Sequence, residues 1–274
     1  MTAPARHLAW RLGRRLYCAA RGEQRRDVIA RNGEAMLQRR AIAATGAARP
    51  FTVLDIGANR GDWTASLLAE LPPARRAPGR LALHAFEPVR ETAALFRDRI
   101  DASGGAVTLH ETALSDSCGE AEIALAGPGA GTSSLHPPEP GLERRRVPRT
   151  PLSALADRLG LAHIHLAKSD TEGHDLRVLA GARPLLEAGR IDLFQFEYNH
   201  RWIFARAFLR DVFALIDGLD YRLVRIDPAA CTVFDAWHPE LDRFFQSNYA
   251  LVHARALGWL PLRHGRFDRF NVYA

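Results

Sequence analysis

Long apolar runs and paired cysteines are scarce in this chain, and each scarcity excludes a class of protein. Lysine is scarce as well. No apolar run approaches the ~20 residues that a membrane-spanning helix needs. The three cysteines, Cys18, Cys118 and Cys231, are scattered and form neither a metal-ligand pair nor a disulfide set. The basic N-terminus lacks the apolar core and small-residue cleavage site of a secretion signal. We therefore expect a cytoplasmic protein without a disulfide framework.

Positive charge comes almost wholly from arginine. The net charge of +6 in principle favours an anionic partner. Much of the excess lies in residues 1–40 and in the cluster 144–146, and abundant Ala, Gly and Pro suggest a bias toward GC-rich codons. Solvated surface charge is therefore favoured over nucleic-acid binding. Lys168 is the only lysine among 37 basic residues, so the sequence favours a role that needs a compact ammonium group there.

The N-terminal residues have a helical pattern of their own. Leu8, Leu12 and Leu16 recur four residues apart with arginines between them, and residues 5–45 are predicted to form two helices. We expect residues 1–48 to be a helical extension that acts as a lid or pairs with a second subunit in a homodimer. Binding to an anionic membrane surface is a further option, and simple packing on the main domain is favoured over it.

From residue 51 onward, strand and helix patterns alternate as in a parallel sheet. The predicted strands are 52–56, 81–86, 106–110, 163–169 and 191–197, with helices at 62–71, 89–101, 151–159 and 174–188. A final strand pair is predicted at 221–226 and 248–253. Insertions near 118–150, with a short strand at 120–125, and near 227–247 interrupt the alternation. We expect one α/β domain over 49–274, with helices on both faces and the first insertion bordering the pocket.

A glycine-rich turn follows the first predicted strand, and an acidic residue ends the second. Gly57 and Gly61, on either side of Asn59, let the backbone approach a ligand, while Glu87 can accept hydrogen bonds from both ribose hydroxyls. Together they predict a nucleoside site. Asp55 would repel a diphosphate but would suit a cationic amino-acid group. S-adenosylmethionine, with its sulfonium and ammonium groups, therefore fits better than a dinucleotide or a cofactor-free turn.

Four motifs together resemble the FkbM-type S-adenosylmethionine-dependent methyltransferases. They are Val53-Leu-Asp-Ile-Gly-Ala-Asn-Arg-Gly61, Phe86-Glu-Pro88, Ala113-Leu-Ser-Asp116 and Asp170-Thr-Glu-Gly-His-Asp-Leu-Arg-Val-Leu-Ala-Gly181. The resemblance covers about residues 50–255, and the last motif is its most specific part. It implies a seven-stranded class I methyltransferase fold, a Rossmann-like sheet with helices on both faces, and methylation of a hydroxyl on a sugar, glycoside or polyketide-type natural product. The family's usual Leu-Lys-Ile-Asp-Val-Glu-Gly is here Ala-Lys-Ser-Asp-Thr-Glu-Gly, with the acidic pair unchanged.

The reacting groups should follow the fourth and fifth strands, because ligands of open α/β sheets bind beyond the carboxyl ends of the strands. Asp170 is the first choice for the base that takes the acceptor proton, a step typically worth 10²–10⁴-fold. Lys168 would tune Asp170 or contact the acceptor oxygen, and His174 and His200 are alternative bases. Cofactor contacts are expected from Asp55, Gly57, Asn59, Gly61, Glu87, Ala113 and Asp170, and contacts with a small-molecule or glycan acceptor from Glu172, His174, Glu197 and Trp202.

Three alternatives stay open. Asp170, Glu197 and Asn199 would offer hard oxygen ligands to Mg²⁺, although strand-end carboxylates also occur without an ion. An RNA ribose 2′-O-methyltransferase would also use a lysine and acidic residues, whereas base methylation is disfavoured because no Asn/Asp-Pro-Pro-aromatic turn follows strand four. An inactive cofactor-binding interaction domain is the third reading, against which the retained Lys168 and Asp170 argue.

Overall fold

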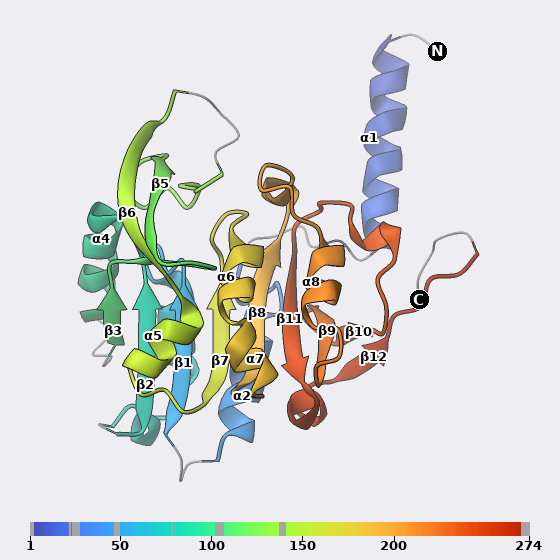
Figure 1. Ribbon diagram of the computed structural model, residues 1–274. Coiled ribbons are helices and arrows are strands. Elements are labelled where there is room, and N and C mark those ends of the chain that lie inside the picture. Colours follow the sequence, from blue (N-terminus) through green and yellow to red (C-terminus); the bar gives the residue numbers. More distant parts are fainter. Residues whose placement is uncertain are drawn as a thin grey trace.

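The computed structural model describes residues 3–21, 23, 28–46, 50–77, 79–101, 107–136 and 141–269. Within these residues the main sheet has nine strands: β1 (Phe51–Ile56), β2 (Leu81–Phe86), β3 (Val107–His110), β7 (Ile164–Ser169), β8 (Ile191–Tyr198), β9 (Tyr221–Ile226), β10 (Cys231–Phe234), β11 (Ser247–His253) and β12 (Leu262–His264). Their order is β12-β10-β9-β11-β8-β7-β1-β2-β3 (Figure 1). The five adjacent strands β3, β2, β1, β7 and β8 are parallel, and β11 runs antiparallel to both its neighbours, β8 and β9.

Helices cover both faces of this sheet (Figure 1). One layer consists of α5 (Leu152–Arg158), α6 (Asp175–Gly181), α7 (Arg183–Glu187) and α8 (Leu209–Leu215), and the other of α2 (Glu34–Ala44), α3 (Asp62–Glu70) and α4 (Arg90–Asp101). Because side chains of a strand alternate between its faces, Leu54 and Ile56 pack under the first layer and Val53 under the second. The two apolar cores lie on opposite sides of the sheet.

The main sheet confirms the predicted α/β class with helices on both faces, but it has two strands more than the seven predicted. The extra strands are β10, which the 227–247 insertion supplies, and β12 near the end of the described chain. The predicted helix 174–188 is two helices, because Pro184 stands in the first turn of α7 and restarts the helix there. Short 3₁₀ segments occur at Pro73–Arg75, His200–Ile203, Pro239–Leu241 and Ala254–Trp259.

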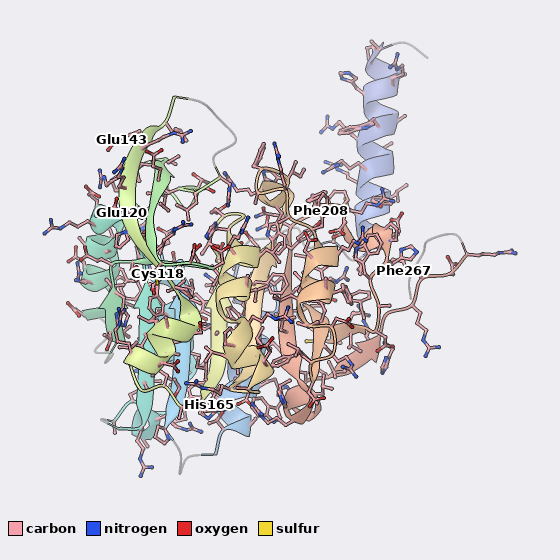
Figure 2. The ribbon with its side chains drawn as sticks, viewed as in Figure 1. Cys118, Glu120, Glu143, His165, Phe208 and Phe267 are labelled. Carbon is pink, nitrogen blue, oxygen red and sulfur yellow. The ribbon has the colours of Figure 1, made fainter. Side chains whose placement is uncertain are left out.

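The 118–150 insertion forms most of a second sheet, which sequence periodicity predicts only in part. Its strands, in the order β4-β6-β5, are β4 (Ala113–Ser115), β5 (Gly119–Leu125) and β6 (Glu143–Pro151). Figure 2 labels Glu120 and Glu143 on its exposed part. Arg145 bonds Glu91 and Glu143, while Arg144 and Arg146 lie 3.6 and 3.7 Å from glutamates of β5. The basic cluster 144–146 is therefore ion-paired on the surface.

The N-terminal residues differ sharply in how they pack. α1 (Ala3–Ala20) has no buried residue and projects from the body (Figure 1), whereas Leu37 and Ala41 of α2 are fully buried against the sheet. The 34–44 part of the extension thus belongs to the core of the main domain. No helix of the described chain combines the length and apolarity that crossing a membrane would take.

Candidate functional site

A cavity opens beyond the carboxyl ends of β1, β2 and β7, where the strand order reverses between β1 and β7. It is lined by Gly57, Asn59, Glu87, Thr112, Ala113, Ile123, Gly131, Ser133, Leu135, Asp170, Thr171, Glu172 and His174, among others. Such a reversal is where ligands bind in open α/β sheets. Five of the seven predicted cofactor residues line it, and residues of the 118–150 insertion form one wall, as predicted.

Glu87 lies just after β2 and is buried at the cavity wall. Its Oε2 accepts a hydrogen bond from the Asn59 backbone N–H at 3.1 Å, and its Oε1 accepts one from Val89 N–H at 2.9 Å. These two bonds fix the carboxylate, yet each oxygen has a further lone pair to offer a ligand. Burial raises the pKa of Glu87 to about 7.

The two glycines of the turn have different reasons to be glycine. Gly57 has φ 74° and borders the cavity, and a Cβ built on it would lie 2.0 Å from the Asp170 carbonyl oxygen. Gly57 therefore lets the β1 and β7 loops touch. Gly61 has φ 81°, and its Cβ would lie 2.9 Å from the ring of Phe96. The predicted ligand contact of Gly61 is not supported, because the close approach at this position serves the packing of α3 against α4.

A row of polar side chains crosses the sheet beneath the cavity. Asp55 is the register partner of Lys168, which is in turn the partner of Gln195 on β8. All three point toward the layer that holds α2, where the buried carboxylate of Glu34 accepts hydrogen bonds from Gln195 and Asn32. Asp55 is fully buried and accepts a 2.6 Å bond from Thr64, so its predicted direct contact with the cofactor is wrong.

Lys168 joins this buried row to the cavity. Its ammonium lies 3.2 Å from Oδ2 of Asp170, which borders the cavity, and 3.8 Å from Oδ1 of Asp55. Burial opposes the charge on Lys168, yet the carboxylates of Asp170, Asp55 and Glu34 hold its pKa above the usual value. Burial raises the pKa values of Asp55 and Glu34, and the lysine partly offsets this. Glu34, which the sequence analysis did not single out, is thus part of the electrostatics of the site.

Two of the residues that depart from the usual family motif, Ser169 and Thr171, form hydrogen bonds that brace the loop after β7. Ser169 donates a 2.6 Å hydrogen bond to Oδ1 of buried Asp175, which also accepts one from the Thr171 N–H at 3.1 Å. Burial raises the pKa of Asp175 to about 6. The Thr171 side chain borders the cavity. The Ser169 hydroxyl and the Thr171 backbone N–H together hold Asp175 and the loop after β7 in place.

Two carboxylates, those of Glu172 and Glu197, lie beside Asp170, and each of the three already has a partner within the protein. Ligand oxygens of Asp170, Glu172 and Glu197 lie within 4.8 Å of one another. Asp170 pairs with Lys168, Glu172 with Arg201 at 2.7 Å, and Glu197 accepts bonds from the Asn199 and Gln246 amides. The Asn199 amide oxygen accepts from Arg201 N–H, away from the carboxylates. Of the predicted Mg²⁺ ligands, Asp170 and Glu197 therefore lie close together but Asn199 does not turn its oxygen toward them, and cations or amide donors of the protein already bind each carboxylate.

The predicted histidines and tryptophan occupy other roles. His174 lines the cavity, but Ser115 and His136 each lie 3.0 Å from one of its ring nitrogens, and burial lowers its pKa to about 3. His200 is exposed and lines a separate groove beside α1, so it is not placed to act as the base. Trp202 is fully buried and donates to the Glu197 carbonyl, so its predicted contact with substrate is wrong.

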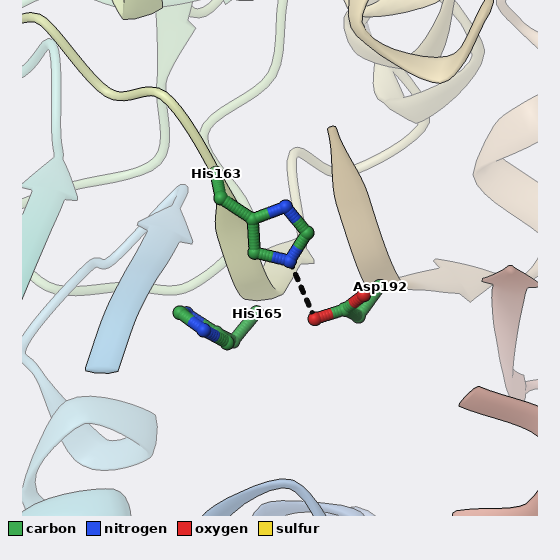
Figure 3. Close-up of side chains that lie close together, drawn as sticks. All are labelled: His163, His165 and Asp192. Carbon is green, nitrogen blue, oxygen red and sulfur yellow. Dashed lines mark hydrogen bonds and ion pairs between the residues drawn. The ribbon is translucent and has the colours of Figure 1, made fainter. Parts of the chain in front are cut away.

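A second titratable cluster lies at the opposite edge of the sheet, at the amino ends of β7 and β8. His163 Nε2 is 2.7 Å from Asp192, and the His165 ring is beside them (Figure 3). The Thr52 N–H donates to His165 Nδ1, which leaves the proton of the neutral ring on Nε2. Burial lowers the pKa of His165 to about 4. His165 therefore presents no free lone pair to a metal, and the cluster is a hydrogen-bonded His163–Asp192 pair with a neighbouring ring.

Comparison with protein families identifies one match. The model of the methyltransferase FkbM domain matches residues 55–223, a span that begins at Asp55 on β1 and ends within β9. It includes the turn, the second strand end and the whole loop after β7, and so every cavity residue described above. No curated protein sequence matches the chain.

Several solved methyltransferases are similar to the chain at low sequence identity. A methyltransferase FkbM from Methylobacillus flagellatus KT is 15% identical, with a TM-score of 0.46 over 77% of this chain and 47% of that one. The bifunctional kinase-methyltransferase WbdD is 12% identical, with a TM-score of 0.43 over 80% and 38%. An rRNA methylase from Streptococcus thermophilus is 12% identical, with a TM-score of 0.40 over 80% and 94%. The chain spans less than half the length of the first two.

Proposed function

The chain belongs to the FkbM methyltransferase family, whose methyl donor is S-adenosylmethionine, and we propose that it methylates a hydroxyl group of a sugar, glycoside or polyketide-type natural product. The observation that carries the proposal is the position of Asp170. Its carboxylate borders the cavity next to Gly57, is partly exposed to an acceptor and is paired with the buried ammonium of Lys168. A base held in this way beside a nucleoside site suits proton removal from an alcohol.

The cavity residues fit a nucleoside cofactor. Glu87 presents a fixed carboxylate with lone pairs to spare, which suits the two ribose hydroxyls. One buried oxygen at the cavity, Asn59 Oδ1, has no hydrogen-bond partner among the described residues. Buried polar atoms are seldom left unpaired in native proteins, so this oxygen supports a polar ligand. When bound, S-adenosylmethionine would supply an activated methyl group on a sulfonium.

The protein's part in the reaction is to orient the acceptor and to take its proton. The Asp170 carboxylate would accept the proton of the acceptor hydroxyl at one oxygen, while Lys168 holds the other at 3.2 Å. Glu172 and Glu197, close by, would accept hydrogen bonds from further hydroxyls of the acceptor. The leaving thioether needs no proton, so alignment and exclusion of water supply the remaining acceleration. Neutral His174 and the residues from Gly131 to Leu135 close the side of the cavity.

A methyl-transfer assay with labelled S-adenosylmethionine tests this function. Wild-type protein is incubated with a panel of glycosides and macrolide aglycones, and ether-linked label is measured. Asp170→Asn should lower kcat about 10²–10⁴-fold, while S-adenosylhomocysteine still binds. Asp157→Asn, an exposed aspartate paired with Arg190, is the matched control and should retain full activity. Full activity of Asp170→Asn, or transfer of label only to RNA ribose, would contradict the proposal.

A further inference from the structure

A groove lined by arginines and aromatic rings runs beside the candidate active site, between α1 and the segment 244–246. From the helix it is lined by Trp10, Arg11, Arg14 and Arg15, and from the body by His200, Phe244, Phe245 and Gln246. Arg11 and Arg14, three residues apart, lie on one face of α1, as helical geometry requires. The function proposed above uses none of these residues directly. Only Gln246 contacts a residue that it uses, because its amide donates to Glu197.

The groove has a strong positive balance. α1 has four arginines and no acidic residue over its whole length. Glu23 is the one carboxylate among the groove's lining residues in the described chain, and Arg21 pairs with it at 2.8 Å. Two guanidinium groups on neighbouring turns present several N–H donors in fixed planes, a geometry that matches phosphate oxygens. The groove therefore favours an anionic ligand, and a phosphate in particular.

Aromatic rings form the other wall of the groove. The Arg14 guanidinium lies 5.0 Å from the Phe245 ring centre and 5.8 Å from that of Trp10. Phe244 stacks on Tyr198 at 5.5 Å and has φ 55°, a left-handed conformation that is unusual for a bulky residue. Strained residues of this kind cluster at ligand sites, where the surrounding structure holds them in place. Flat apolar surface next to guanidinium groups suits a phosphate attached to a sugar or an aromatic ring.

The groove lies next to Glu197, one of the carboxylates beside the cavity. The Gln246 amide, which lines the groove, donates a 2.7 Å hydrogen bond to Oε1 of Glu197. Ligand oxygens of Glu197 in turn lie within 4.8 Å of those of Asp170. An extended acceptor that reaches from the arginines to Asp170 would pass Gln246 and Glu197. Leu8, Leu12 and Leu16 are exposed on α1 and do not line the groove.

We propose that this groove binds a phosphate group of the acceptor and thereby positions the acceptor's hydroxyl at Asp170. The inference rests on the proposed methyl transfer and narrows its substrate class to phosphate-bearing acceptors, such as sugar phosphates and nucleoside-diphosphate sugars. Arg11 and Arg14 bind the phosphate, and Phe245 and Trp10 contact the attached group. The substrate would then be supplied by phosphorylation or nucleotidyl transfer to a carbohydrate.

Equilibrium binding of inorganic pyrophosphate and of UDP-glucose to protein saturated with S-adenosylhomocysteine tests the proposal. The double variant Arg11→Gln/Arg14→Gln should bind both probes about tenfold more weakly or worse, since both probes lose charge-assisted hydrogen bonds to the guanidinium groups. Arg97→Gln/Arg144→Gln removes two arginines that are exposed on α4 and β6, and should bind both probes as the wild type does. Methyl glucoside, which has no phosphate, should bind all variants equally.

Three results would overturn the groove proposal: no pyrophosphate binding by the wild type, equal losses in both double variants, or unchanged binding in the groove variant. A fourth arm uses phosphatidylglycerol vesicles. If the groove variant loses vesicle binding but keeps both soluble probes, the arginines serve a lipid surface and the proposal is wrong. S-adenosylhomocysteine affinity is measured for every variant, so failure of the cofactor site itself is seen separately from failure of the groove.

Discussion

Replacing Lys168 with methionine removes the one cation of the buried polar row while keeping the length of the side chain. In the wild type the ammonium lies 3.2 Å from Asp170 and 3.8 Å from Asp55. Asp170 is partly solvated and can be left to water. Asp55 is fully buried, and so its charge would lose the only cation within 4 Å in the described chain. Breaking a buried pair in this way typically costs about 3–5 kcal/mol.

The loss of folding stability should depend on pH, because the unpaired Asp55 carboxylate can be neutralised by taking up a proton. Protonating an aspartate of ordinary pKa 3.8 costs about 6 kcal/mol at about pH 8 but only about 1.6 kcal/mol at about pH 5, since each unit is worth about 1.36 kcal/mol. In the variant the folded state then binds more protons than the unfolded state. Raising the pH therefore destabilises it relative to the wild type.

Urea unfolding followed by tryptophan fluorescence measures this difference. We expect Lys168→Met to lose about 3–5 kcal/mol at about pH 8 and about 1–2 kcal/mol at about pH 5. Adding Asp55→Asn to the variant should recover much of the loss and flatten its pH dependence. A loss below about 1 kcal/mol at the higher pH, or one that is the same at both pH values, would refute the account of the buried row.

Three further predictions concern the cavity and its walls. Burial raises the pKa of Glu87 to about 7, and ribose hydroxyls would donate to its ionised carboxylate. S-adenosylhomocysteine affinity measured by calorimetry should therefore rise with pH through about 7, and Glu87→Gln should remove that dependence. Gly57→Ala would place a Cβ 2.0 Å from the Asp170 carbonyl oxygen, and should lower the free energy of unfolding in urea by about 3 kcal/mol or more. Gly79 has a similar φ of 75° but nothing within 4 Å of its Cβ position, so Gly79→Ala should lower it by about 1 kcal/mol. Equal losses in the two variants would contradict the close contact at Gly57. Trp202→Phe should lower stability by about 2 kcal/mol through lost packing and a lost hydrogen bond, with KM for any acceptor unchanged, and a large rise in KM would return Trp202 to the substrate site.

The positions of the cavity residues could be predicted because strand ends converge. Gly57, Glu87 and Asp170 each follow a parallel strand, and the carboxyl ends of those strands share one edge of the sheet. The error at Asp55 arises from strand alternation. Asp55 and Val53 are two residues apart in β1, so their side chains lie on the same face of the sheet. Val53 faces the α2 and α3 layer, so the Asp55 side chain points under that layer and not beyond the strand end.

Other features had no local signal. Glu34 reaches the polar row only because α2 packs on the sheet across from Lys168, and nothing within residues 30–38 indicates that contact. β6 contains consecutive arginines and two prolines, so it lacks the alternation typical of a strand. It forms because its backbone pairs with β5 and its arginines face the β5 glutamates.

Calorimetric titration of S-adenosylhomocysteine would show whether Glu87 and its neighbours bind S-adenosylmethionine. The wild type should bind in the micromolar range, Glu87→Ala should bind at least about tenfold more weakly, and Glu111→Ala, an exposed glutamate paired with Arg97, should bind as the wild type does. Absence of binding by the wild type, or equal binding by all three proteins, would contradict the account.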